Sequence, residues 1–487
     1  MISAILFISF FIFLILGVPI GICLGLSSVC AILYSGTSLT IVATNMYSGI
    51  SKFLLLAIPF FVLSGNIMAK AGISKRLIKF VDTCVGHKKG GIAIVCVIVA
   101  CFFGAISGSG PATVAALGAV LIPAMVEQGG FSAPFMATSS SIAIVIPPSI
   151  AFVVYASITG TSIADMFMAG IVPGLLMGVA LVIVVMLEAK KHNIKPSREK
   201  ASGKERWDAF KDAFWGFLMP IIILGGIYGG IFTPTEAAAV SVVYGLFVGM
   251  VIYREVSFRD MFDILVDSAK TTGGIMLIVA SASLFSFVCT KFGIADAASN
   301  LLGSIAHNQF TFLLIVNIIF LIAGCFIDAN SAMYIFIPIM LPVCKALGYD
   351  IVAFGVMATV NLAIGQVTPP VGVNLFVAIS IKIKKGLEVT LQEISRAVVP
   401  MIAACVAVLL IVTYIPITST FLPKALAKEG SYTGDQSSAS SDTASKEAGD
   451  GNNSFDTIAD YSDLDWPEMT WNFACSTTET STWADGG

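Results

Sequence analysis

Long apolar segments dominate this chain and constrain its fold more than any other feature. Segments of about 16–25 apolar residues recur along the first ~420 positions, and each is long enough to cross a bilayer core of roughly 30 Å. Hydrophobic residues make up 57% of the 487 residues and charged residues only 12%, against roughly 45–50% and 25% in soluble proteins. We therefore predict an all-α polytopic membrane protein. The run from Met1 to Tyr34 lacks a basic leading region, so we expect membrane helix there rather than a cleaved signal.

The distribution of charge separates a C-terminal tail from the rest of the chain. Residues 431–487 contain eleven acidic residues and one basic residue, Lys446, and they are rich in Ser, Thr, Asp and Gly without a periodic apolar pattern. Such a composition buries too little apolar surface to fold. We predict a disordered acidic tail at 426–487 that takes no part in the chemistry.

Landmarks in the apolar part of the chain recur, which indicates an internal repeat. Pro19 opens a second short helix in the first half, as Pro234 does in the second half after a helix at 213–232. The pair Pro147-Pro148 likewise recurs as Pro369-Pro370. The predicted organisation is a first repeat at 1–190, a cytoplasmic linker at 191–212 and a second repeat at 213–425.

Both repeats are expected to contain the same elements in the same order. A weakly amphipathic segment precedes a spanning helix, which is followed by a pair of short apolar limbs, a helix broken at Pro-Pro, and a closing helix. In the first repeat we expect these elements at 38–50, 51–71, 91–127, 133–165 and 167–188. In the second repeat we expect them at 257–271, 272–292, 310–348, 352–381 and 397–419.

A polar tip joins each pair of limbs, Ser107-Gly-Ser-Gly-Pro111 in the first repeat and Asp328-Ala-Asn-Ser331 in the second. Such backbone is tolerated at membrane depth only inside protein or beside water, which favours re-entrant hairpins over pairs of thin crossings. The four basic clusters, at 75–89, 190–211, 254–259 and 382–385, fall on one side in either case, so the positive-inside rule does not decide between hairpins and crossings. With hairpins, each repeat has five crossings, the second repeat is inverted, and both termini lie in the periplasm.

The two Pro-Pro pairs break helices inside long apolar runs. Proline removes a backbone donor and clashes with the preceding turn, and lipid offers no water to the freed carbonyls. A broken helix therefore exposes carbonyls that suit a cation and N–H groups that suit an anion. Kinks for packing alone would explain one break, whereas two breaks at matching positions beside polar tips favour binding sites. Oxygen ligands of this kind suit a hard cation such as Na+.

The predicted site residues lie in or beside the tips and the breaks. The predicted sodium-site residues are Gly104, Ser107, Gly108, Ser109, Val145, Pro147, Gly324, Asp328, Asn330, Ser331, Gly365, Val367 and Thr368. The predicted substrate-binding residues are Ser64, Asn66, Gly110, Pro111, Thr113, Pro148, Ser149, Pro370, Gly372 and Asn374.

Some of these residues have an alternative structural role. Ser64 and Asn66 lie well along an apolar helix, where polar groups either face a pocket or form hydrogen bonds between helices. Asp328 is a carboxylate far from the predicted membrane surfaces, so we expect a sodium ligand or an organiser of the hairpin tip. Thr233 and Glu236 have the spacing of a capping box around Pro234, which is a structural signal.

Three motifs resemble the large membrane subunit of TRAP (tripartite ATP-independent periplasmic) transporters. They are Gly230-Ile-Phe-Thr-Pro-Thr-Glu-Ala-Ala-Ala-Val240, Leu56-Ala-Ile-Pro-Phe-Phe-Val-Leu-Ser-Gly65 and Asn361-Leu-Ala-Ile-Gly-Gln-Val-Thr-Pro-Pro-Val-Gly-Val-Asn-Leu375. The resemblance covers residues 1 to about 425. It implies sodium-driven uptake of small organic anions, such as C4-dicarboxylates, other carboxylic acids or sialic acid, across the bacterial inner membrane. It also implies an elevator motion of a transport domain against a scaffold domain, a small membrane subunit and a periplasmic substrate-binding protein.

Other classes of function fit the sequence less well. An intramembrane serine protease needs a base near Ser107 or Ser109, and no histidine lies in an apolar segment. A channel would need rings of charge or a carbonyl filter built by symmetry. We therefore expect neither an enzyme nor a nucleic-acid-binding protein. A stand-alone sodium/dicarboxylate or citrate symporter with similar hairpins remains the alternative.

Overall fold

The computed structural model describes residues 1–127, 132–191, 196–305, 308–381 and 391–426, and every regular element there is a helix. The acidic tail lies outside the described residues. The first half contains α1 (Ile2–Ile15), α2 (Ile20–Tyr34), α3 (Thr40–Ile50), the 3-10 helix η1 (Phe53–Leu56), α4 (Ala57–Lys70), α5 (Ile73–Val85), α6 (Gly91–Ser107), α7 (Gly110–Glu127), α8 (Ser132–Val145), α9 (Ile150–Thr159) and α10 (Ile163–Lys191).

The second half begins with α11 (Gly203–Tyr228), α12 (Pro234–Leu246), the π-helix η2 (Phe247–Ile252), α13 (Phe258–Lys291) and α14 (Ile294–Ile305). It continues with α15 (Gln309–Phe326), α16 (Ala329–Ala346), α17 (Ile351–Gly365), α18 (Val373–Ser380), α19 (Leu391–Ala397), α20 (Val399–Tyr414) and α21 (Ile417–Leu426). All-helical architecture is therefore confirmed.

Local signals fix several helix ends as the sequence predicts. Pro19 directly precedes α2, and Pro234 is the first residue of α12. The Thr233 hydroxyl accepts a hydrogen bond from the Glu236 amide, and a Glu236 carboxylate oxygen accepts one from the Thr233 amide, so the predicted capping box is present. The left-handed residues Gly72 (φ 70°) and Gly293 (φ 65°) precede α5 and α14, because glycine takes this conformation without a steric penalty.

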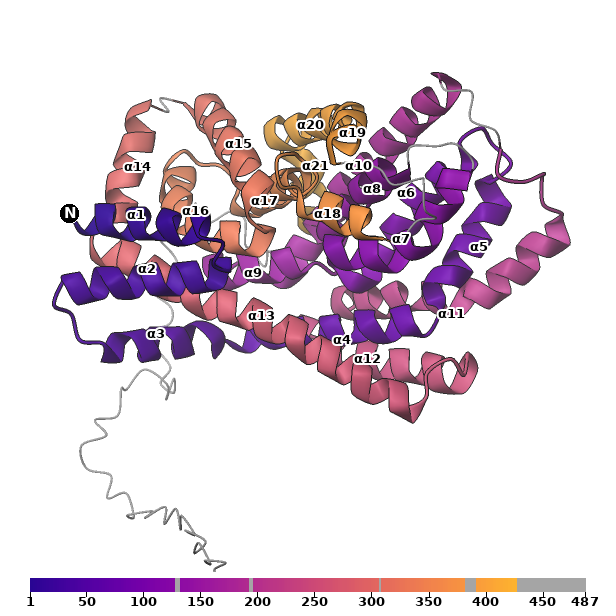
Figure 1. Cartoon of the computed structure of the whole chain (residues 1–487), viewed down its shortest axis with the longest axis horizontal. Coiled ribbons are helices and arrows are strands. Elements are labelled where there is room, and N and C mark those ends of the chain that lie inside the picture. The colour runs from indigo at the N-terminus through magenta and orange to yellow at the C-terminus, as the bar shows by residue number, and fades with distance from the viewer. Residues whose placement is uncertain (128–131, 192–195, 306–307, 382–390, 427–487) are drawn as a thin grey trace, which may run out of the picture. The chain divides into compact units, whose positions relative to one another are not determined.

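The predicted boundary between an amphipathic segment at 257–271 and a spanning helix at 272–292 is wrong. These residues belong to α13, a single helix of 34 residues. After this boundary α13 is closely packed, because a β-carbon on Gly21 would lie 3.1 Å from Ile278 Cγ1 and one on Gly49 would lie 2.5 Å from Ser283 Cβ. Helices α2 and α3 therefore lie directly against α13, as Figure 1 shows.

Two other predicted boundaries also need correction. Helix α11 begins at Gly203 rather than at 213, because the Ser202 hydroxyl accepts a hydrogen bond from the Glu205 amide and caps the helix. Part of the expected linker is thus helical. The expected closing helix of the second half is divided into α20 and α21, which are bent by 56°.

Within the described residues, seven helices are long and apolar enough to cross a membrane, or up to nine if each bent pair is one span. One of these bent pairs is formed by α8 and α9, which meet at the Pro147-Pro148 break with a bend of 40°. Helices α15 and α16, with 18 residues each, are long and apolar enough for each to cross a membrane. Helices α6 and α7 are also apolar, but they are shorter than a typical crossing.

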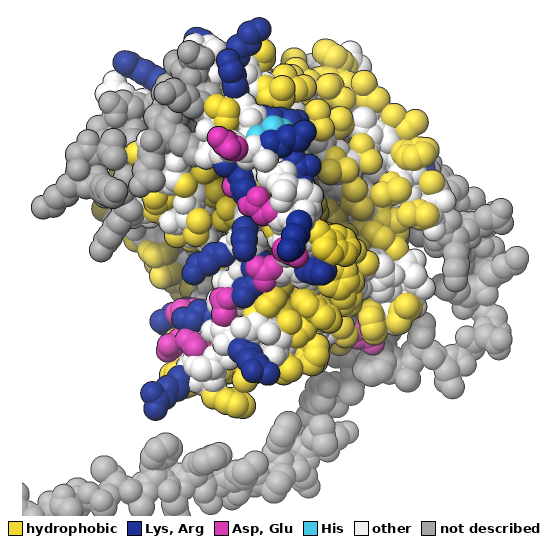
Figure 2. Space-filling model, turned by 90° about the vertical axis from the view of Figure 1, so that its right-hand side faces the viewer, with side chains coloured by type: hydrophobic (Ala, Val, Ile, Leu, Met, Phe, Trp, Pro, Cys, Tyr) yellow, Lys and Arg dark blue, Asp and Glu magenta, His cyan; other side chains and the backbone are white. Residues whose placement is uncertain are grey.

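Charged side chains gather on one face of the helical body. Figure 2 shows a band of Lys, Arg, Asp and Glu side chains between hydrophobic surfaces, on the face where α5 and α11 lie in Figure 1. Arg76 of α5 pairs with Asp212 of α11 at 3.2 Å and with Glu255 at 2.6 Å, while Arg198 pairs with Asp82 at 3.6 Å. Three of the four predicted basic clusters therefore meet in one region, and the fourth, at 382–385, lies outside the described residues.

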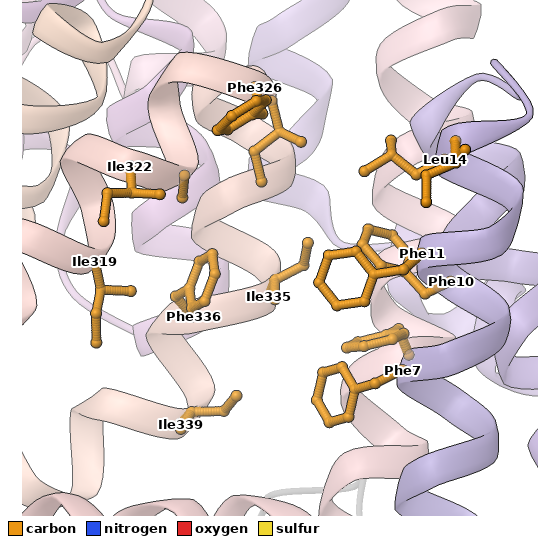
Figure 3. Close-up of a pocket in the computed structure, with 14 residues that line it drawn as sticks. Phe7, Phe10, Phe11, Leu14, Ile319, Ile322, Phe326, Ile335, Phe336 and Ile339 are labelled. Atoms are coloured by element: carbon orange, nitrogen blue, oxygen red, sulfur yellow. The ribbon is translucent and has the colours of Figure 1, made fainter.

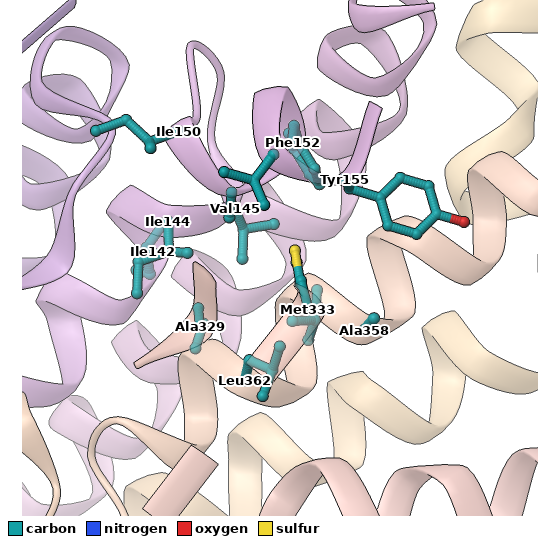
Figure 4. Packing of buried hydrophobic residues seen from close by; sticks show 14 of the residues in the cluster. Ile142, Ile144, Val145, Ile150, Phe152, Tyr155, Ala329, Met333, Ala358 and Leu362 are labelled. Carbon is teal, nitrogen blue, oxygen red and sulfur yellow. The ribbon is translucent and has the colours of Figure 1, made fainter. Parts of the chain in front are cut away.

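The two halves share one apolar core. Figure 4 shows Val145 and Phe152 of the first broken helix packed near Met333 of α16 and Leu362 of α17. Glycines allow the limbs to approach the broken helices closely in both halves. A β-carbon on Gly104 would lie 2.6 Å from Ala143 Cα, and one on Gly365 would lie 2.5 Å from Gly324 Cα. The corresponding pairs α6–α8 and α15–α17 thus pack backbone against backbone.

Candidate functional site

The turn between α6 and α7 is a compact polar element inside the apolar body. Gly108 ends α6 in the left-handed conformation (φ 60°), which brings the chain back at once into α7. The hydroxyls of Ser107 and Thr113 form a hydrogen bond of 2.9 Å, and the Thr113 hydroxyl donates to the Ser109 carbonyl at 2.8 Å. Ser107 is 6% exposed and Thr113 fully buried, so this turn holds oxygen atoms in fixed positions away from water.

The first helix break lies between α8 and α9. The Pro147-Pro148 bond is cis, and Ser149 stands at the start of α9. Its hydroxyl donates to the Ile144 carbonyl at 2.5 Å and accepts from the Phe152 amide at 3.4 Å. Ser149 therefore caps the second half-helix and also satisfies a carbonyl that the first half-helix leaves without a helical partner.

The second helix break, between α17 and α18, contains polar side chains without partners. The Pro369-Pro370 bond is also cis. The Thr368 hydroxyl donates to the Ile364 carbonyl at 2.8 Å, and the Asn374 amide nitrogen of the main chain donates to the Gln366 carbonyl at 3.0 Å. In contrast, the side-chain nitrogen and oxygen of Asn374 and the side-chain oxygen of Gln366 are buried and form no hydrogen bond with any described residue. An unsatisfied buried polar group costs about 1–3 kcal/mol, so a ligand or water bound to these atoms would be stabilising.

The tip between α15 and α16 is organised by Asp328. Its carboxylate accepts hydrogen bonds from the main-chain amides of Asn330 (3.1 Å) and Ser331 (3.2 Å) and from the Ser331 hydroxyl. Asp328 is thus the N-cap of α16. The geometry supports the organiser role, whereas a sodium-ligand role for Asp328 stays a prediction.

The first tip contacts both breaks and α4. A β-carbon on Gly108 would lie 2.5 Å from the Pro148 carbonyl oxygen, and one on Gly110 would lie 2.8 Å from the Asn374 side-chain nitrogen. A β-carbon on Gly65 of α4 would lie 3.3 Å from Ser107 Cα. The absence of side chains at these glycines therefore brings the tip, both breaks and α4 into direct contact.

A small cavity opens beside this junction. Its volume is about 110 Å³, and it is lined by α4, the first tip, the start of α9, and α13. Its polar lining comes from Asn66, Ser107, Ser109 and Thr271. We treat the junction and this cavity together as the candidate site.

The other predicted site residues lie partly at the cavity and partly elsewhere in the helical body. Asn66 lines the cavity but also donates to the Ser268 hydroxyl of α13 at 2.8 Å, so both expected roles apply to it. Ser64 is fully buried, and its hydroxyl has no hydrogen bond. The Val145 carbonyl lies against α10, since a β-carbon on Gly170 would be 2.5 Å from its oxygen. Gly372 approaches the second pair of limbs, where its amide donates to the Cys325 carbonyl at 3.3 Å.

Sequence reasoning missed a polar network beside the second break. The Asn361 side chain donates to the Asn317 carbonyl and side-chain oxygen at 2.9 and 2.8 Å, and Asn317 in turn donates to the Thr413 hydroxyl at 3.2 Å. The network ties α17 to α15 and α20, and the Asn361 side-chain oxygen has no partner. Gln366 was also missed as a site residue. The available signal was the presence of amide side chains in otherwise apolar helices.

Comparison with known proteins identifies the family of this chain. Residues 7–418 match the family model described as "Tripartite ATP-independent periplasmic transporter, DctM component". The chain belongs to the DctM family. Members of this family are permease subunits rather than enzymes, and they are multi-pass proteins of the bacterial inner membrane.

Several DctM relatives are similar over nearly their whole length. The C4-dicarboxylate TRAP transporter large permease protein DctM of Rhodobacter capsulatus is 41% identical, with 84% of this chain and 96% of the relative covered. The sialic acid TRAP transporter large permease protein SiaM of Vibrio cholerae is 34% identical, with 84% and 95% covered.

A third relative is longer than this chain. It is the isethionate TRAP transporter permease protein DctMQ of Oleidesulfovibrio alaskensis, 41% identical, with 86% of this chain and 66% of the relative covered. Among solved structures, the YdaH transporter of Alcanivorax borkumensis matches with a TM-score of 0.57 and 14% identity, covering 79% of this chain and 89% of that one. This likeness concerns only the fold of the DctM chain, not its function.

Proposed function

We propose that this DctM chain is the large permease of a sodium-coupled transporter that imports a small organic anion. The observation that carries the proposal is the fully buried Asn374 side chain, which lies against the first tip at Gly110 and whose nitrogen and oxygen have no partner in the described part of the chain. A ligand that accepts from this amide would remove the energetic cost of burying it. Among the described residues, the side-chain oxygens of Gln366 and Ser64 are likewise buried without a partner.

Small organic anions are the substrate class that fits both the site and the relatives. The names of the three relatives refer to C4-dicarboxylates, isethionate and sialic acid, which all carry a carboxylate or sulfonate group. At the junction, a carboxylate would be held by the Asn374 amide, hydroxyl groups and the N-terminal amides of α7 and α9, because helix N-termini favour negative charge. Neutral donors of this kind suit many anions, so the site does not select among them.

The energetics of moving an anion inward support coupling to a cation. An inside-negative potential opposes each negative charge by about 2.3 kcal/mol per 100 mV. At least two cations must therefore accompany a dianion for the potential not to oppose its uptake. The two tips and two breaks offer main-chain carbonyls together with the oxygens of Ser107, Ser109, Thr113 and Thr368, which are the ligands that a hard cation prefers.

In the transport cycle that we propose, the hairpins and broken helices of the two repeats move together. The matching elements, with close glycine contacts between α6 and α8 and between α15 and α17, support two inverted repeats with re-entrant hairpins at α6–α7 and α15–α16. In this proposal the hairpins and broken helices form a transport domain, which moves as an elevator against a scaffold. The termini then lie in the periplasm and the charged band of Figure 2 in the cytoplasm.

Two protein partners complete the proposal. Large permeases of this family work with a small membrane subunit and a periplasmic substrate-binding protein. The longer DctMQ relative supports the small subunit as a partner, because its additional length and its name fit a fused permease. A stand-alone symporter of the same fold is less well supported, since the family model is that of a component of a tripartite transporter.

Uptake by vesicles that contain the chain with both partners tests the proposal. We expect uptake of a dicarboxylate or another organic anion to stop when the sodium gradient is abolished. Asn374→Ala should raise the substrate concentration for half-maximal uptake roughly tenfold or more, as expected for one lost hydrogen bond to a charged group. Asn45→Ala is the matched control, because Asn45 donates only to the Ile41 carbonyl of its own helix. Uptake that is equal with and without the gradient would refute sodium coupling.

A further inference from the structure

A large apolar groove lies between α1 and the α15–α16 pair. Its volume is about 770 Å³. One wall is formed by α1 with Phe285 of α13, and the other by α15 and α16 (Figure 3). All fourteen residues that line it are apolar. Water in such a groove would find no hydrogen-bonding partner, and cavities of this kind stay dry.

The groove is continuous with exposed apolar surface of the chain. Its rim residues Phe11 (54% exposed), Ile15 (85%), Ile322 (56%) and Phe326 (50%) project outward from helices of the membrane body. The deeper residues are nearly buried, as Ile335 is at 7%. The groove is therefore an inward extension of the lipid-facing surface, where hydrocarbon is the surrounding medium.

We propose that the groove binds an acyl chain of a membrane phospholipid. The dimensions favour a slender chain over a protein segment. An α-helix with its side chains is about 10–12 Å across, so this volume would admit less than about two turns of helix. A flexible alkyl chain, in contrast, fills an irregular apolar space and replaces the dispersion contacts that an empty groove would lack.

The bound acyl chain would support the second polar tip. Ile327 lines the groove and directly precedes Asp328, the N-cap of α16. The groove wall behind it is held by the edge-to-face contact of Phe320 and Phe336, with ring centroids 6.0 Å apart. An acyl chain in the groove thus packs against the two helices that position the Asp328 tip.

Photochemical labelling tests this proposal. The chain is reconstituted with phosphatidylethanolamine that carries a diazirine in the middle of one acyl chain, transferred into lipid-free detergent, and irradiated. Mass spectrometry then maps the labelled peptides. We expect label in α1, α15 and α16 to persist, while label around Val179, which is 59% exposed on α10, falls about tenfold, which corresponds to ~1.4 kcal/mol of preferential binding. Equal loss at both places would overturn the proposal.

A filled groove provides the second arm of the test. Ala323→Trp places a large side chain among the lining residues and should abolish the persistent label, whereas the control Val179→Trp should leave it unchanged. Persistent label in Ala323→Trp would also overturn the proposal. If Ala323→Trp does not fold, Ile322→Trp at the rim replaces it. A photoreactive residue at position 322, with the small subunit co-expressed, distinguishes the occupants: an adduct with lipid supports the proposal, and an adduct with the subunit refutes it.

Discussion

The Lys52 ammonium group donates a hydrogen bond of 2.6 Å to the main-chain carbonyl of Ser157, across 105 residues of sequence. Lys52 precedes η1, and Ser157 lies in the last turn of α9, where helix carbonyls lack partners and the helix dipole favours a cation. The Ser157 hydroxyl is also hydrogen-bonded to the Tyr334 hydroxyl of α16 at 3.0 Å. Burial lowers the pKa of Lys52. This lysine therefore joins the α3–α4 connection to the point where the first broken helix meets α16.

Removing this link should loosen the end of α9. Lys52→Met retains an apolar stem but loses the charge-assisted hydrogen bond. Because Lys52 is exposed to solvent, we take the contribution of this bond to stability as about 1 kcal/mol, below the usual value for a bond to a charged group. Hydrogen exchange at the amides of residues 156–160 should then accelerate roughly fivefold, since 1.4 kcal/mol corresponds to tenfold. Lys52→Arg, which keeps the charge and the donors, should exchange nearly as the native chain does. Unchanged protection in Lys52→Met would show that the link contributes nothing.

The glycine contact between α15 and α17 should tolerate no side chain. In Gly365→Ala the new β-carbon would lie 2.5 Å from Gly324 Cα, and backbone cannot move aside as a flexible side chain can. We expect a loss of about 1–3 kcal/mol or more in the free energy of unfolding, as for overpacked cores, seen as a lower midpoint of thermal unfolding in detergent. Gly274→Ala is the matched control, because nothing lies within 4 Å of its β-carbon and alanine favours the helix. Equal midpoints for the two variants would contradict the close approach.

The sequence predicts those features that depend on local signals. Pro19, the Thr233–Glu236 capping box and the two Pro-Pro breaks each act on the backbone of their own segment, and all are present in the structure. The continuity of α13 could not be predicted in this way. Gly273 and Gly274 weaken a helix locally, but α13 contacts α4 before these glycines, at Ser268, and α2 and α3 after them, at Ile278 and Ser283.

The candidate site was predicted only in part for the same reason. The tip and break residues were recognisable because polar groups in apolar runs are conspicuous. The contact of Gly110 with Asn374, and the network from Asn361 through Asn317 to Thr413, join segments far apart in the chain. No periodicity or spacing encodes such pairs. Charge also misled the prediction at the start of α11. The charged segment before residue 213 suggested a linker, but the structure has a capped helix there.

The proposed inversion of the repeats predicts the sidedness of three positions. Cysteines introduced at Lys191, Lys384 and Ser437 should react with an impermeant thiol reagent in intact cells only at position 437. This follows because the basic clusters are placed in the cytoplasm. The native cysteines must first be shown to be unreactive in the same assay; the nine described ones are buried or half-buried. Labelling of the Lys384 cysteine from outside would contradict the inverted arrangement.

The first tip provides the sharpest test of sodium binding. Ser107→Ala removes one hydroxyl oxygen from the Ser107–Thr113 pair while leaving α6 and α7 apolar and packed, so the variant should fold and reach the membrane at near-native levels. A lost oxygen ligand should weaken sodium binding by about 1–3 kcal/mol, by analogy with an unsatisfied buried partner. The sodium concentration for half-maximal uptake should therefore rise roughly tenfold or more, as it should for Asn330→Ala at the second tip.

Glu236→Ala is the control for these tip variants. It breaks the capping box of α12 and should lower stability without changing the sodium dependence. The sodium assignment would be wrong if the tip variants responded to sodium normally while Glu236→Ala shifted the response.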